Sequence, residues 1–224
     1  YTGSGPLASE LAFDKSKAQA IFKKNGILVP EFHVMRDVGE TSRLTLNRFP
    51  VVVKPASSGS SVGVSIVQKK EDVTKACLEA FRYSDAVLIE EYIRGRELTV
   101  GILGEEALPV VEVIPQEKFY DYDAKYKSSQ TRYEFPARLT AEEAALVKNT
   151  AMRAYRALGC SIMGRVDIIL AQGQAYVLEI NTIPGLTSKS LLPKAAQASG
   201  LEFGDLCVKI LELSQNRVKV NQKW

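Results

Sequence analysis

Apolar residues recur along the chain at both helical and strand spacing, and the two kinds of segment are mixed. Helical spacing predicts helices over 8–25, 71–83, 141–158, 190–198 and 203–215. Short β-rich runs predict strands over 31–35, 51–54, 64–67, 86–93, 97–103 and 107–114, and a hairpin of 161–171 with 175–181. Hairpins interspersed with helices are typical of an α+β fold, not of a doubly wound sheet.

The pattern also predicts two lobes and one long connection. A natural boundary near 90–95 divides the chain into lobes of residues 1–93 and 94–224, with a crevice between them. The segment 115–136 has no clear period and is longer than an ordinary connection, which is typical of a functional lid. Its aromatic residues alternate with basic ones, so stacking of single-stranded nucleobases is the alternative.

Composition narrows the class of protein. Hydrophobic residues make up 46% of the 224 positions, the net charge is +3, and no run of about five like charges occurs. A nucleic-acid arm, a polybasic anchor and a membrane span of about 18 apolar residues are therefore not expected. Three widely spaced cysteines favour a reduced, cytoplasmic setting. The chain starts at Tyr1 in a Gly/Ser-rich stretch, so we expect a piece of a longer protein.

Two lysines stand where apolar residues are expected. Lys15 lies on the apolar stripe of the first predicted helix, with Leu11, Ala18 and Phe22. Either the Lys15 side chain snorkels from the edge of the stripe, or its ammonium group is held over a cleft to meet an anion. Lys54 closes the strand VVVK before the small-residue loop PASSGSSVG. This arrangement suits phosphate binding, and a flexible hairpin with an edge lysine is the alternative.

The hairpin RVDIILAQGQAYVLEINT carries polar residues where both strands are otherwise apolar. A two-residue turn would put Asp167 and Glu179 on opposite faces, whereas a three-residue loop at 172–174 pairs them and pairs Arg165 with Asn181. Two carboxylates and an amide are hard oxygen ligands, suited to Mg²⁺ that also holds phosphate. A hairpin with one solvated polar face is the alternative.

In this order, the segments resemble the D-alanine–D-alanine ligase family of the ATP-grasp superfamily. The resemblance runs to about residue 213 through YTGSG, Asp14-Lys15, VVVKP, GSSVGVS, IEEYIRGRELTVGILG, FYDYDAKY, GRVD, LEINTIPG and SLLPKAA. It implies the ATP-grasp fold: two α+β lobes whose antiparallel sheets enclose a nucleotide cleft.

The resemblance also implies roles for single residues. For ATP it implies Lys15 and Lys54 on the phosphates, the backbone at Glu90, Glu91 and Ile93 on the adenine, Glu97 on the ribose, and Phe119 and Ile169 beside the base. For metal it implies two Mg²⁺ ions, with Mn²⁺ as a substitute, on Asp167, Glu179 and Asn181. For catalysis it implies that Arg165 stabilises the tetrahedral intermediate and that Lys125 lies near the transferred phosphate. It also implies that Ser60 and Tyr126 tie the closed lid to the glycine loop. The Gly185 backbone would lie near the reacting carboxylate. Ser190 and Leu191 would line the second D-alanine site.

The implied reaction joins two D-alanines through D-alanyl phosphate, for peptidoglycan precursors. Three departures stand out: Ser57-Ser58 replace a frequent Arg-Glu, Lys189 replaces a frequent histidine, and the family's N-terminal domain is not in this sequence. The expected partners are D-alanine, ATP and that domain of the same polypeptide, with no nucleic acid and no membrane; a homodimer is left open. The alternatives are a Mg·ATP-binding module inactive by itself, or another ATP-grasp carboxylate–amine ligase.

Overall fold

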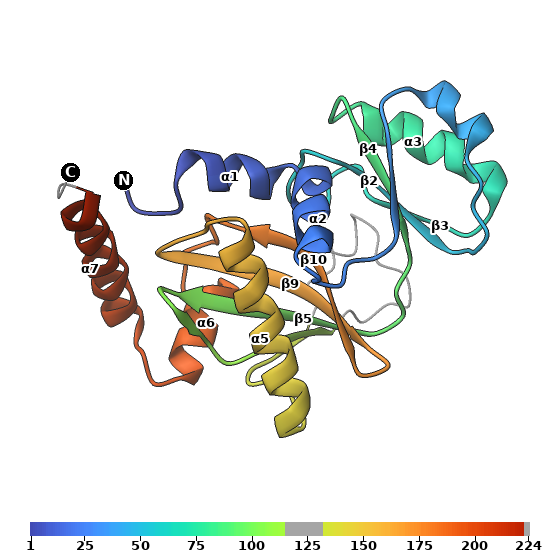
Figure 1. Ribbon diagram of the computed structural model, residues 1–224. Coiled ribbons are helices and arrows are strands. Elements are labelled where there is room, and N and C mark those ends of the chain that lie inside the picture. The colour runs from blue at the N-terminus through green and yellow to red at the C-terminus, as the bar shows by residue number, and fades with distance from the viewer. Residues whose placement is uncertain (115–131, 222–224) are drawn as a thin grey trace.

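Two antiparallel sheets form the framework of the molecule (Figure 1). The computed structural model describes residues 1–114 and 132–221, with side chains to residue 215. The smaller sheet has the order β1-β4-β2-β3, with the bounds Phe32–Met35, Val87–Glu91, Val51–Pro55 and Ser65–Val67. Its core is closed by α3 (Val73–Phe81), beside the short helices η1 (Val38–Arg43) and η2 (Lys70–Asp72).

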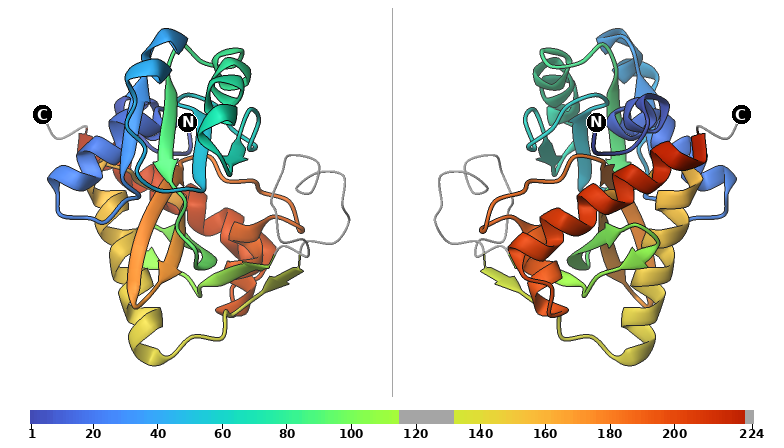
Figure 2. Two further views of the ribbon diagram at one scale, coloured as in Figure 1. Left: turned by 90° about the vertical axis from the view of Figure 1, so that its right-hand side faces the viewer. Right: turned by 90° about the vertical axis from the view of Figure 1, so that its left-hand side faces the viewer.

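The larger sheet has the order β10-β9-β5-β7-β8, and β6 pairs with β5. These strands span Gln174–Asn181, Met163–Ala171, Arg96–Leu103, Val111–Ile114, Arg132–Glu134 and, for β6, Glu106–Ala107. The helix α5 (Ala141–Ala157) packs on one face, and α6 (Leu191–Ala198) with α7 (Phe203–Asn221) lies on the other (Figure 2). The expected α+β class with antiparallel sheets is thus confirmed.

The predicted single helix over 8–25 is wrong, because the structure has two helices, α1 (Pro6–Phe13) and α2 (Lys15–Lys24). They part at Asp14, whose backbone is extended and whose side chain accepts hydrogen bonds from the amides of Ser16 and Lys17. An aspartate that caps a helix offers its backbone an alternative to helical continuation. The stripe itself survives the break, since Lys15, Ala18 and Phe22 are all buried.

Replacing the capping Asp14 with alanine is expected to lower the free energy of unfolding by about 1 kcal/mol, because two amides of α2 lose their acceptor. Urea denaturation followed by circular dichroism measures this loss. Asp85→Ala, at an exposed position outside any helix, is the matched control and should stay within about 0.5 kcal/mol of the unsubstituted protein. Equal effects of the two substitutions would contradict the capping role.

The two N-terminal helices share the core of the larger sheet. Ala12 of α1 and Phe22 of α2 are buried in the same cluster as Val166 of β9 and Tyr155 of α5. The smaller sheet ends at Glu91 and the larger begins at Arg96, on either side of the division at 93/94. The lobes 1–93 and 94–224 stay a prediction, and α1 and α2 pack with the second of them.

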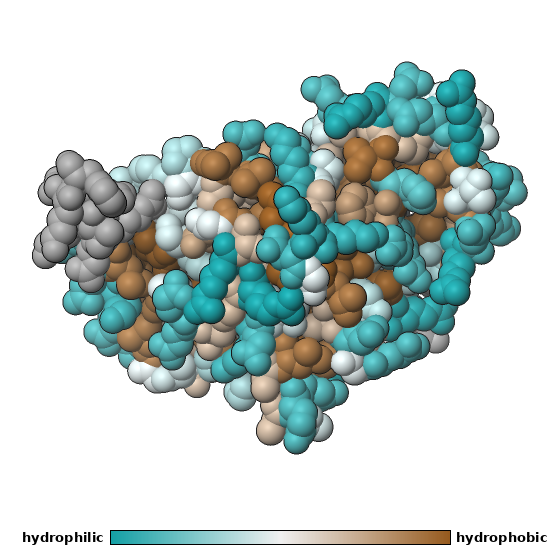
Figure 3. All heavy atoms as spheres, in the orientation of Figure 1, coloured by the Kyte–Doolittle hydropathy of each residue, from teal (hydrophilic) through white to brown (hydrophobic). Residues whose placement is uncertain are grey.

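The outer surface mixes both kinds of residue. On the face in Figure 3, hydrophobic patches are separated by hydrophilic side chains. Across the described ranges, no helix combines the length and the apolar character needed to cross a membrane.

Candidate functional site

A cleft of about 400 Å³ lies between the two sheets, and a second hollow of about 590 Å³ shares part of its lining. Both are lined by Lys15, the loop residues 58–61, Asp167 and Glu179. Lys15 comes from α2, and Lys54 with the small-residue loop comes from the smaller sheet, whereas Asp167 and Glu179 come from the larger sheet. Cations and carboxylates that converge at a concave surface are typical of a site for a charged small molecule.

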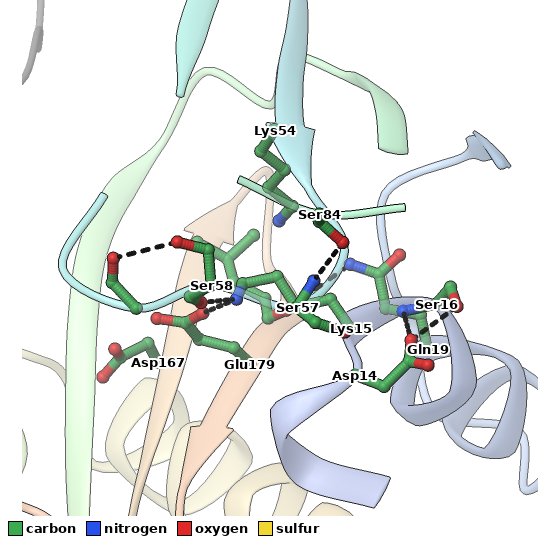
Figure 4. A network of polar contacts seen from close by, with 12 residues as sticks. Asp14, Lys15, Ser16, Gln19, Lys54, Ser57, Ser58, Ser84, Asp167 and Glu179 are labelled. Carbon is green, nitrogen blue, oxygen red and sulfur yellow. Dashed lines mark hydrogen bonds and ion pairs between the residues drawn. The ribbon is translucent and has the colours of Figure 1, made fainter. Parts of the chain in front are cut away.

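Lys15 spans the cleft instead of reaching solvent. Its Nζ donates to the carbonyl oxygen of Ser58 at 2.6 Å and lies 3.2 Å from Glu179 Oε2 (Figure 4). The lysine side chain is only 10% exposed. Of the two interpretations of this residue, the structure therefore supports the cation held in a cleft.

Lys54 projects from the end of β2 toward the same region (Figure 4). Its Nζ lies 2.7 Å from Glu90 Oε2, and the two side chains are 9% and 2% exposed. The other Glu90 oxygen, Oε1, accepts a hydrogen bond from Gln19 Nε2 at 2.6 Å. Sequence reasoning named Lys54 and Glu90 but missed Gln19; the available signal was its position four residues after Lys15, on the same helix face.

The loop after β2 holds an uncommon backbone conformation. Ser60 and Ser61 have φ of 56° and 57°, in the left-handed region that non-glycine residues rarely adopt. Gly63 also has positive φ, and a Cβ there would lie 2.9 Å from Pro55 Cγ. Such conformations concentrate at ligand-binding loops, and Ser60 lines both hollows here.

The hairpin of β9 and β10 brings the predicted polar residues together by an unpredicted route. Gln174 pairs with Ala171, so the turn has two residues, Gln172-Gly173, and the three-residue loop is wrong. A bulge between Val177 and Glu179 then supplies the extra residue. Asp167 consequently pairs with Glu179, and Arg165 with Asn181, as the sequence interpretation required.

Asp167 is the most heavily engaged acid of this hairpin. Both of its carboxylate oxygens accept from Arg165, at 2.9 Å each, and Oδ1 also accepts from Thr99 Oγ1 at 2.6 Å. The charge of Asp167 raises the pKa of the Arg165 guanidinium above its usual value, so this arginine is cationic at any working pH. A fixed guanidinium is therefore presented to the second hollow.

The chemistry of the donor set fits a hard divalent cation. Asp167 and Glu179 face each other across the hairpin and both line the cleft, and Asn181 lies in the adjoining hollow. Across residues 1–114 and 132–215, no group of three or more His, Cys, Asp or Glu side chains forms a metal cluster. Two carboxylates and one amide oxygen suffice when phosphate oxygens complete the shell, which is how Mg²⁺ is commonly held.

Comparison with known proteins identifies the family. A family model described as D-ala D-ala ligase C-terminus matches residues 21–212. The chain belongs to the D-alanine–D-alanine ligase family. The D-alanine–D-alanine ligase of Methylacidiphilum infernorum is 47% identical over 222 residues, covering 99% of this chain and 72% of that protein.

Solved D-alanine–D-alanine ligases confirm the ATP-grasp fold. The Bacillus anthracis ligase complexed with ATP has a TM-score of 0.83 at 35% identity. The match covers 99% of this chain and 72% of the Bacillus anthracis chain. The VanG D-Ala:D-Ser ligase from Enterococcus faecalis has a TM-score of 0.85 at 32% identity. The match covers 95% of this chain and 64% of the VanG chain.

Most residues implied by the D-alanine–D-alanine ligase resemblance lie at the two hollows. The first is also lined by Glu90, Glu91, Ile93, Glu97 and Ile169, and the second by Leu191. Ser190 stands at the N-cap position of α6 without a capping hydrogen bond from its side chain, and its Oγ accepts from the amide of Thr187 at 3.2 Å. A Cβ on Gly185 would lie 2.7 Å from that Oγ, so a larger residue there would require the Ser190 hydroxyl to move. Phe119, Lys125 and Tyr126 lie outside the described residues.

Proposed function

We propose that this chain provides the ATP-binding and catalytic part of an enzyme that ligates two D-alanines, with cleavage of ATP to ADP and phosphate, for peptidoglycan precursors. The observation that carries this proposal is the cleft that Lys15 and Lys54 line together with the carboxylates of Asp167 and Glu179. Lys15 pairs there with Glu179 and Lys54 with Glu90. Membership of the D-alanine–D-alanine ligase family supports the substrates.

In the proposed reaction, a carboxylate oxygen of the first D-alanine takes the γ-phosphoryl group of ATP and releases ADP. The amine of the second D-alanine then attacks the acyl carbon, the C–O bond to phosphate breaks, and the amine loses a proton. Phosphoryl transfer depends mainly on positioning and charge neutralisation. Lys15 and Lys54 supply cations for the phosphates, and Arg165 supplies one for the oxyanion on the acyl carbon.

Mg²⁺ would be held by Asp167, Glu179 and Asn181, singly or as the pair of ions that the resemblance implies, with Mn²⁺ as a substitute. When bound, it supplies positive charge to the phosphate oxygens. Arg165 and Lys15 pair with the two carboxylates, Arg165 with Asp167 and Lys15 with Glu179.

The remaining assignments belong to the same proposal. Glu90, Glu91, Ile93, Glu97, Phe119 and Ile169 would surround the nucleoside. Ser60 and Tyr126 would tie the lid to the loop, and Lys125 would lie near the transferred phosphate. Ser190, Leu191 and the Gly185 backbone position the second D-alanine. The contact of Ser190 Oγ with Thr187, 2.9 Å between their hydroxyl oxygens, supports a fixed hydroxyl at that position.

Incubation of the protein with ATP, Mg²⁺ and D-alanine tests the proposal. We expect D-alanine-dependent release of ADP, a dipeptide of D-alanine detected by mass spectrometry, and loss of both when EDTA removes the metal. Calorimetric binding of Mg·ATP without any ligation would instead identify a nucleotide-binding module inactive by itself. Absence of Mg·ATP binding would refute both.

Ligation of D-alanine to a different D-amino acid is the second candidate. Lys189, beside Ser190 at a position where the resemblance implies a frequent histidine, is the observation that favours it. Competition between D-alanine and D-serine as the second substrate decides the matter: the proposed function requires the D-Ala-D-Ala product to dominate at equal concentrations.

A further inference from the structure

Gln19 is a buried polar side chain that joins the two sheets from behind the cleft. It lies on α2 and has no exposed surface. Its Nε2 donates to Glu90 Oε1 on β4 at 2.6 Å and lies 3.4 Å from the carbonyl oxygen of Leu178 on β10. One amide group therefore contacts both the smaller sheet and the bulge that brings Glu179 opposite Asp167.

The contact to Glu90 completes a chain of buried groups that ends in the cleft. Glu90 is 2% exposed and shares its carboxylate between Gln19 on Oε1 and Lys54 on Oε2, at 2.6 and 2.7 Å. Lys54 and Glu90 line the cleft, whereas among the described residues Gln19 lines neither hollow. Gln19 consequently cannot touch a nucleotide there and can act only through its neighbours.

The orientation of the Gln19 amide is fixed by charge. Turning the amide over would place its oxygen against the Glu90 carboxylate, so Nε2 must point there. Its Oε1 then finds no hydrogen-bond partner within the described part of the chain, although it is buried. A buried acceptor without a donor is unfavourable, and an apolar side chain would avoid that cost. The benefit of glutamine at this position therefore lies in its donor.

We propose that Gln19 is a positioning residue for ATP binding: by holding one oxygen of Glu90, it fixes the other oxygen on Lys54 and so fixes the Lys54 ammonium in the cleft. The inference rests on the proposed function, which assigns Lys54 to the phosphates of ATP. Gln19 is thereby added to the residues required for ATP binding, although it makes no contact with the nucleotide.

Gln19→Met, which keeps the length and removes the donor, tests this role. Without the amide donor, the Glu90 carboxylate is free to rotate and the Lys54 ammonium moves with it. We therefore expect the calorimetric Kd for Mg·ATP to rise about tenfold. Gln197→Met makes the same exchange at an exposed position of α6 and should leave the Kd unchanged. An unchanged Kd for a folded Gln19→Met protein overturns the inference.

A double-mutant cycle separates positioning from a general structural effect. In a Lys54→Met background the group that Gln19 positions is gone, so adding Gln19→Met should weaken Mg·ATP binding by less than about twofold further. A full further tenfold loss, adding independently to that of Lys54→Met, overturns the inference. Failure of the unsubstituted protein to bind Mg·ATP would refute the proposed function itself, so the two failures are distinguishable.

Gln19→Glu provides a second readout if the methionine variant does not fold. It places a carboxylate against that of Glu90, and two such groups cannot both stay charged without strong repulsion. When the pair takes up one proton it can regain the hydrogen bond, and while both carboxylates are charged it cannot. We therefore expect the affinity of this variant, relative to the unsubstituted protein, to improve several-fold on acidification. A pH-independent ratio overturns the inference.

Discussion

Lys54→Met is expected to lower the free energy of unfolding by about 3–5 kcal/mol and to weaken Mg·ATP binding about 100-fold. The stability loss arises because Glu90, 2% exposed, would keep a buried charge without its cation. The affinity loss arises because a charge-assisted contact to phosphate disappears. Urea denaturation measures the first and titration calorimetry the second.

A second substitution separates the two effects. Lys54→Met combined with Glu90→Gln removes the buried charge altogether, so stability should recover by more than half while ATP affinity stays low. Arg156→Met is the matched control, since it breaks a 2.6 Å pair with Glu105 whose side chains are 60% and 74% exposed. That change should cost less than about 1 kcal/mol. A similar cost for Lys54→Met would show that the buried pair does not stabilise the fold.

Strand periodicity predicted the faces of β9 correctly, whereas in β10 the bulge puts Val177 on the buried face and not with Glu179 and Asn181. Along β9, buried residues alternate with half-buried ones, so Arg165 and Asp167 share a face with Ile169. This follows directly from the two-residue repeat of a strand. The oxygen ligands on that face already indicated Mg²⁺, and the family resemblance then assigned roles to single residues. The existence of most helices and strands followed from their apolar spacing.

The route by which Asp167 meets Glu179 was not predictable from alternation. Val177, Leu178 and Ile180 are all apolar, so the residue types do not show where an extra residue enters the strand. A bulge is set by the local backbone and its neighbours, not by a distinctive residue type. The predicted three-residue loop and the observed bulge add one residue at different places, which explains why the pairing was right and the turn wrong.

Contacts between segments that are distant in the sequence explain why the roles of Asp14 and Gln19 were not predicted. Asp14 looked like a polar position inside a helix, but it caps α2 and bridges to Ser57 on the loop after β2. Gln19 looked like an ordinary helix residue, and its partner Glu90 lies 71 positions away. Periodicity reports which side of an element faces inward, and it carries no information on which buried polar groups meet there.

Arg165→Met is expected to lower kcat for ligation by about 100- to 1000-fold while leaving the Kd for Mg·ATP within about threefold. The reason is geometric. The Nε and Nη2 atoms hold Asp167 at 2.9 Å each, so the guanidinium is locked on the wall of the second hollow, beside the first. A cation preorganised there stabilises charge that develops during the reaction more than charge already present on bound ATP.

Arg165→Lys should lower kcat almost as much as Arg165→Met. An ammonium group cannot hold Asp167 through two parallel hydrogen bonds and still face the hollow from a fixed position. Steady-state ADP release at saturating ATP and D-alanine gives kcat, and calorimetry gives the nucleotide affinity. Arg153→Met, at an exposed position where the guanidinium contacts only the carbonyls of Asn25 and Gly26 in the described structure, is the matched control and should retain full turnover. A proportional loss of ATP affinity in the Arg165 variants would place this residue in nucleotide binding instead, and full turnover in Arg165→Lys would show that only its charge matters.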